Sequence, residues 1–159
     1  MTFPFRLRLI PAVLAALLFA TGCGISNKEL AGLAISVESI RSFSQSDGQT
    51  ELVATLRYHN ETIRPIGIRE MVLKLAINGI TVDKITSKKP LGTMSMSSNT
   101  QDATFIIKSD ATAAKIRAAL ASGAVNYRLD TELMVGSGDE EIFARPIATG
   151  SVDTAGLSL

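Results

Sequence analysis

The chain has little of what most catalytic and binding sites are built from. Its 159 residues include one cysteine, one histidine, two tyrosines and no tryptophan. A single cysteine excludes an intrachain disulfide, and a single histidine excludes the common histidine-rich metal sites. Lysine and arginine are not clustered, so the basic stripe of a nucleic-acid-binding protein is absent. We therefore expect no metal, no cofactor and no nucleic-acid partner.

The remaining composition is typical of one folded domain with a short appendage. Hydrophobic residues make up 46% of the chain and charged residues 19%, as in globular rather than disordered proteins. Without Arg6 and Arg8, 14 basic and 15 acidic residues remain. The body of the protein thus has no electrostatic reason to lie flat on anionic lipid.

The N-terminal segment differs from the rest of the chain. "MTFPFRLRLIPAVLAALLFATGC" has two early arginines and then an uncharged run, Leu9 to Cys23, shorter than the ~20 residues of a membrane span. A basic start, a short apolar middle and small final residues are typical of an export signal. The ending "ATGC" resembles a bacterial lipobox, with Ala20 where leucine is usual. The resemblance implies that Cys23 becomes the lipid-modified first residue. The alternative is a plain signal peptide, or an uncleaved anchor, with an incidental cysteine.

These features predict how the chain is divided. We expect a lipoprotein signal peptide at 1–22, a lipidated cysteine and tether at 23–32, one folded domain at 33–152 and a C-terminal tail at 153–159. Two acyl chains already suffice for stable anchoring, so the expected membrane contact is the lipid at Cys23. The next residue is Gly24 rather than aspartate. In a cell with two membranes, the sorting pattern of such lipoproteins implies the periplasmic face of the outer membrane.

From about Leu33 onward, polar and apolar residues alternate with the period of β-strands. The pair Asn78-Gly79 lies between two such stretches and is a strong hairpin signal, because a type I′ turn needs positive φ at both central residues. The predicted strands are 33–43, 51–59, 71–79, 80–86, 102–108, 125–135 and 142–150.

One alanine-rich segment, 109–123, lacks the two-residue period and predicts a helix of three turns. Asp110 can cap its start by accepting backbone N–H groups, and Gly123 can supply a left-handed end. The helix would bury a narrow stripe of Ala113, Ile116 and Leu120. About seven strands, antiparallel hairpins and one short helix predict an all-β fold, an immunoglobulin/fibronectin-III-like antiparallel β-sandwich.

The stretch "YHNETIRPI", Tyr58 to Ile66, gathers the residue types of a catalytic site. His59 falls on the polar face by pattern, so we expect a solvated histidine rather than a general base. No G-x-S-x-G motif offers a nucleophile, and the serines of "TMSMSSNT" lie in a predicted loop. Met94 and Met96 in that loop are expected to pack at a strand edge. An enzyme would become the better hypothesis only if a deep pocket joined His59 to a serine and a carboxylate.

The same stretch is better explained as a corner between two strands. Asn60 is expected to turn the chain by bonding its own backbone, and Pro65 to begin the next strand, where its missing N–H is tolerated. The pattern resembles the late-embryogenesis-abundant (LEA) type 2 family and its WHy (water stress and hypersensitive response) domain. That family has Asn-Pro-Asn followed by Pro-Leu at the start of a strand. Asn60, Pro65 and Ile66 match, whereas Glu61 and Thr62 replace the middle proline and the second asparagine.

Two further features extend the resemblance to roughly 33–135. The hairpin with Asn78 and Gly79 is similar to one of the family, and so is the helix followed by a strand that contains Tyr127. The resemblance implies a non-enzymatic sandwich linked to desiccation or water-stress protection, with no catalytic residues to transfer. Its partners would be partly unfolded client proteins or a membrane surface. The alternative is a lipid-tethered interaction module that docks onto an envelope complex, for example by strand addition at an exposed sheet edge.

Overall fold

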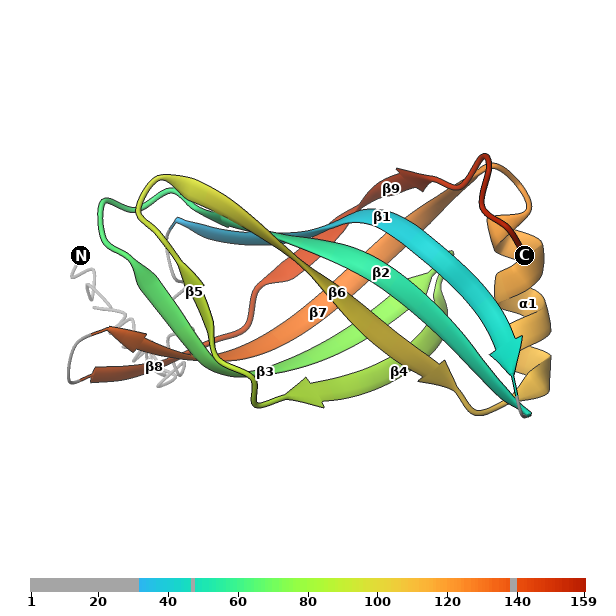
Figure 1. Cartoon of the computed structure of the whole chain (residues 1–159), viewed down its shortest axis with the longest axis horizontal. Coiled ribbons are helices and arrows are strands. Elements are labelled where there is room, and N and C mark those ends of the chain that lie inside the picture. Colours follow the sequence, from blue (N-terminus) through green and yellow to red (C-terminus); the bar gives the residue numbers. More distant parts are fainter. Residues whose placement is uncertain (1–31, 47, 138–139) are drawn as a thin grey trace, which may run out of the picture.

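A computed structural model describes residues 32–46, 48–137 and 140–159. The predicted signal peptide, Cys23 and all of the tether except Gly32 lie outside the described residues. Two antiparallel sheets pack face to face in the described part (Figure 1). The smaller sheet has the order β1-β2-β6, formed by Leu33–Ser46, Gln49–Asn60 and Ser97–Ile107.

The larger sheet has the order β4-β3-β7-β8, with β5 also paired to β3 and β9 also paired to β7. Its central strands are β3 (Ile66–Ile77) and β7 (Ala124–Ser137). One edge is formed by β4 (Ile80–Ser87) and β5 (Leu91–Thr93), the other by β8 (Glu140–Ala144) and β9 (Ile147–Asp153). The predicted all-β sandwich is confirmed. Its two sheets correspond to the ABE and C′CFG strands of the immunoglobulin-like architecture.

Alternating side chains from both sheets form one core, as the period of two requires. In β2 every second residue from Thr50 to Asn60 is buried. The largest side chains that are less than 2% exposed come from both sheets and the helix: Leu52, Leu56, Tyr58, Ile68, Met71, Leu73, Leu75, Ile77, Phe105, Ile116, Leu120 and Leu129. Burial of each such apolar side chain contributes roughly 2 kcal/mol to stability, and these contributions together hold the two sheets against each other.

Each edge of the larger sheet is interrupted, so the nine strands of the described residues occupy seven positions. The predicted strand 142–150 divides at Arg145 and Pro146 into β8 and β9. Proline cannot donate a ladder hydrogen bond, but its carbonyl accepts one from the Thr131 N–H at 3.0 Å. β5 is only three residues long, which is too short for an alternation to be recognised.

The predicted helix is α1 (Asp110–Leu120), at one end of the sandwich (Figure 1). The prediction that Asp110 caps it is wrong. Ser109 keeps an extended backbone and its side chain accepts from the Thr112 N–H, so Asp110 is already the first helical residue. Gly123 has φ +88°, as a left-handed end requires. The predicted stripe of Ala113, Ile116 and Leu120 is buried.

Thr154 fastens the C-terminal end of the chain to the helix. It is buried, its hydroxyl donates to the Leu120 carbonyl at 2.6 Å, and its N–H donates to the Gly123 carbonyl at 3.0 Å. The predicted tail, 153–159, therefore begins inside the packed fold.

Candidate functional sites

Asn60 is the structural centre of the corner between β2 and β3. The side chain is fully buried, and its oxygen accepts from the Thr62 N–H at 2.9 Å and the Thr62 hydroxyl at 2.7 Å. These bonds turn the chain locally, as predicted. Its amide group donates to the carbonyls of Arg64 at 2.8 Å and Met94 at 3.0 Å. The second bond ties this corner to the β5–β6 loop, which no local pattern indicates.

The other motif residues at this end have backbone roles. Pro65 is exposed and directly precedes β3, which begins at the buried Ile66. Glu61, at the position where the family has proline, donates its N–H to the Gly32 carbonyl at 2.6 Å. A proline could not make that bond. Having Glu61 in place of proline therefore permits a hydrogen bond to Gly32, at the start of the folded domain.

The remaining motif residues lie at the opposite end of β3. Asn78 and Gly79 have φ of 47° and 79°, which fits the predicted I′ turn. Asn78 also accepts the Asn126 N–H at 2.9 Å. Tyr127 is 8% exposed and pairs across β7 and β9 with Gly150, where an added Cβ would lie 2.9 Å from the tyrosine ring. The six motif positions thus form two structural corners, not one site.

His59 does meet a serine and a carboxylate, but on an open surface. Its Nδ1 is 2.7 Å from the Ser98 hydroxyl, and its Nε2 is 3.7 Å from Glu61. The register of β2 and β6 places His59 directly opposite Ser98, which accounts for the first contact. The side chains of His59 and Glu61 are 43% and 62% exposed. In serine hydrolases Nε2 faces the serine and Nδ1 the carboxylate, the reverse of this arrangement.

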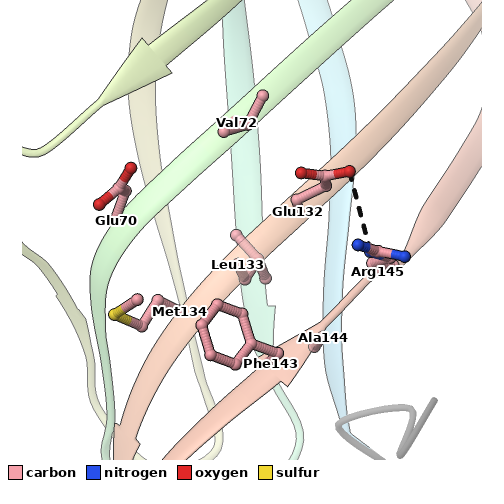
Figure 2. Close-up of a pocket in the computed structure, with 8 residues that line it drawn as sticks. All are labelled: Glu70, Val72, Glu132, Leu133, Met134, Phe143, Ala144 and Arg145. Carbon is pink, nitrogen blue, oxygen red and sulfur yellow. Dashed lines mark ion pairs between the residues drawn. The ribbon is translucent and has the colours of Figure 1, made fainter. Parts of the chain in front are cut away.

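A mainly apolar hollow lies on the outer face of the larger sheet, across β3, β7 and β8 (Figure 2). It has a volume of about 180 Å³. Figure 2 shows the Phe143 ring beside Met134, and Arg145 directed toward Glu132 on the other side. A neighbouring hollow of about 470 Å³ shares Val72, Glu132 and Arg145 with it. We call the two together the outer-face groove, lined by Glu70, Val72, Lys74, Lys84, Asp130, Thr131, Glu132, Leu133, Met134, Phe143, Ala144, Arg145 and Ile147.

The groove combines exposed apolar side chains with paired charges. Phe143 is 68% exposed and Ile147 58% exposed, although both lie on the solvent side of the sheet. Glu132 and Arg145 form an ion pair at 3.8 Å with both side chains more than half exposed. Such a pair contributes about 0–1 kcal/mol and leaves little net charge. The groove is therefore suited to weak apolar contact. The sequence already indicates these exposed apolar side chains, because Phe143 and Ile147 fall on the polar face of the predicted strand "IFARPIATG".

The part of the chain that the structure describes lacks two other classes of feature, a cluster of metal ligands and a membrane-spanning helix. No group of three or more His, Cys, Asp or Glu residues there could hold a metal ion. Within the same ranges, no helix combines the length and the hydropathy that crossing a membrane requires.

The fold and its surfaces define a class, an antiparallel β-sandwich with shallow, open surfaces. Particular solved structures share it. The solution structure of AT1g01470 from Arabidopsis thaliana matches with a TM-score of 0.51 at 14% identity, over 76% of this chain and 83% of that one. At2g46140.1, described as a candidate LEA protein, matches with a TM-score of 0.51 at 14% identity, over 78% and 72%. No family model and no curated protein matches the sequence. The fold is thus LEA-like, as the resemblance implied.

Proposed function

We propose that this chain is a non-enzymatic, lipid-anchored protein of the cell envelope that protects proteins or membrane under water stress. The observation that carries the proposal is the likeness of its sandwich to the solved structure of a candidate LEA protein. The lipobox-like ending at Cys23 supports export and anchoring, with the outer membrane as the destination in a cell with two membranes. The open setting of His59, Ser98 and Glu61 supports a role without catalysis.

The outer-face groove is the surface we assign to client contact. Partly unfolded proteins expose apolar segments, and Val72, Met134, Phe143 and Ile147 offer a shallow apolar surface to them. Fully burying one such side chain contributes about 1.5–3 kcal/mol. Contacts of this size form and break readily, which suits transient protection of many clients better than one stable complex.

The test compares cells without the gene with cells that carry the wild-type gene or a groove variant. The variant Phe143→Ser/Ile147→Ser removes the exposed apolar side chains. Ile106→Ser is the matched control, because Ile106 is an exposed isoleucine on the smaller sheet. We expect the wild type and Ile106→Ser to restore survival after drying or osmotic shock, and the groove variant to restore less. Equal survival with and without the gene, and no protection of a labile enzyme by the protein, would refute the proposal.

A second candidate function is docking onto one envelope complex, favoured by the same groove and by the open edge at β8. A photo-crosslinking residue at position 147 distinguishes the two functions in living cells. One stoichiometric protein adduct indicates a docking module. Many weak adducts that increase under osmotic shock indicate protection.

A further inference from the structure

The end of the sandwich that faces away from α1 carries an unusual set of exposed apolar side chains. Four large apolar side chains in the described residues are more than two-thirds exposed, and three of them lie on two adjoining loops. Ile63 in the β2–β3 loop is 86% exposed, and Met94 and Met96 in the β5–β6 loop are 71% and 68% exposed. The expectation that the methionines pack at a strand edge is wrong. We call these three residues the apolar tip.

Hydrogen bonds between the β2–β3 corner and the β5–β6 loop hold the two loops of the apolar tip together. Asn60 is fully buried and donates to the Met94 carbonyl, and the Met96 N–H donates to the Thr62 carbonyl at 3.0 Å. Met96 has φ +50°, a left-handed conformation that is uncommon for residues other than glycine. Strain of this kind persists only where the surroundings impose it, and here it accompanies an apolar side chain directed to solvent. The tip is a built feature of the fold.

The start of the folded domain lies at the same end. The Gly32 carbonyl accepts from the Glu61 N–H in the β2–β3 loop, and an added Cβ on Gly32 would lie 2.8 Å from Thr62. β1 then runs from Leu33 toward the α1 end (Figure 1). Between Cys23 and Gly32 there are only eight residues, a reach of roughly 30 Å even when fully extended. The 14 residues of β1 already span about 46 Å.

We propose that the apolar tip is a membrane contact, which enters the interfacial layer of the bilayer that holds the acyl chains of Cys23. The inference rests on the proposed lipid anchor and adds an orientation to it. A short tether that ends beside the tip holds the tip close to the lipid surface, so the occupant is the membrane rather than a distant partner. Arg64, exposed between Ile63 and Pro65, can pair with lipid phosphates. The sandwich then stands upright, and the outer-face groove stays open to clients.

The experiment uses the full lipidated protein in vesicles of phosphatidylethanolamine and phosphatidylglycerol. Single cysteines replace Ile63 or Met96 at the tip, and Ile147 or Ala155 away from it. Ile147 is the matched control, because it is also an exposed apolar residue. Each cysteine carries an environment-sensitive fluorophore, and lipids with a nitroxide near the headgroup serve as quenchers. We expect quenching at the two tip positions to exceed that at the two controls by at least about twofold.

Each outcome decides the proposal. Equal quenching at all four positions, in a protein that floats with the vesicles, overturns the tip contact and leaves the lipid anchor intact. A protein that does not float, and whose parent without an added cysteine takes up the fluorophore at Cys23, overturns both the anchor and the tip contact. In isolated envelopes, a photo-crosslinker at position 63 that captures one protein in place of lipid also overturns the membrane contact.

Discussion

Replacing Asn60 tests whether one buried side chain holds two loops together. Truncation to alanine removes the hydrogen bonds donated to the carbonyls of Arg64 and Met94, a longer one to the Thr93 carbonyl at 3.4 Å, and two accepted from Thr62. Some partners regain or keep a bond, because the single proton of the Thr62 hydroxyl can turn to the Arg64 carbonyl once Asn60 is removed, and the Ser97 hydroxyl donates to the Met94 carbonyl, both at 2.8 Å. At about 1 kcal/mol net for each bond, the partial compensation leaves a loss of about 2–3 kcal/mol in the free energy of unfolding.

The variant Asn60→Asp keeps the shape of the side chain but replaces its N–H donor group with an oxygen that accepts hydrogen bonds. A buried carboxylate oxygen would then face two carbonyl oxygens where the amide group had donated. We expect Asn60→Asp to be less stable than Asn60→Ala at pH 7, because an uncompensated charge costs more than a lost bond. The aspartate pKa would be raised in the folded state, so the difference should shrink as the pH falls toward 4.

Thermal and urea unfolding of the Cys23→Ser protein, followed by near-ultraviolet circular dichroism, measures these losses in solution. Both tyrosines, Tyr58 and Tyr127, are buried and no tryptophan is present, so the signal reports core packing. A loss of 2–3 kcal/mol corresponds to a fall in Tm of about 8–12 °C for a domain of this size. Asn99→Ala is the control, since Asn99 is exposed and within the described residues its side chain makes only two bonds, one donated to the Gly92 carbonyl at 3.3 Å and one accepted from the Thr100 N–H at 3.0 Å. If Asn60→Ala and Asn99→Ala unfold within about 2 °C of each other, the assigned role of Asn60 is wrong.

Three further changes follow from the packing. Gly150→Ala places a Cβ against Tyr127 and should lower the free energy of unfolding by about 1–3 kcal/mol, whereas Gly92→Ala, with nothing within 4 Å of its Cβ, should be nearly neutral in the same urea titration. Burial raises the pKa of Tyr58 to about 12, above its ordinary value of 10.0. The unfolded chain therefore loses that proton first as the pH rises, and the contribution of Tyr58 to stability should fall by about 2 kcal/mol between pH 10 and 12, a contribution that Tyr58→Phe removes. Ser109→Ala should cost about 1 kcal/mol by removing the cap of α1; no change in Tm would contradict that assignment.

Local features of the chain were enough to predict most of the fold. A strand places successive side chains on opposite faces, so the alternation from Leu33 onward identified which residues are buried without reference to their partners. The turn at Asn78-Gly79 and the left-handed Gly123 follow from backbone sterics alone. The helix start was misassigned by one residue because serine and aspartate both cap well, and only the extended backbone of Ser109 distinguishes them.

The strand register determined what the sequence could not. His59 lies opposite Ser98, 39 residues later, and Asn60 bonds to Met94, 34 residues later. No local preference links positions so far apart, because such contacts exist only after two sheets have paired and packed. The division of the predicted strand 142–150 at Pro146 likewise involves a distant neighbour. Pro146 has no N–H to donate to β7, and its carbonyl accepts from the Thr131 N–H.

By itself the sequence determined the class of the fold, its buried faces, its tightest turn and the lipobox-like segment at Cys23, because each of these depends on residues close together in the chain. The corner at "YHNETIRPI" was predicted from the sequence, but only the tertiary structure decided that His59 meets Ser98 on an open surface and that Asn60 bonds to the Met94 carbonyl. It also decided that Phe143 and Ile147 border one groove, and that Ile63, Met94 and Met96 gather beside the start of β1. Burial and exposure of a loop side chain depend on what the rest of the fold places next to it, and that information is spread over the whole chain.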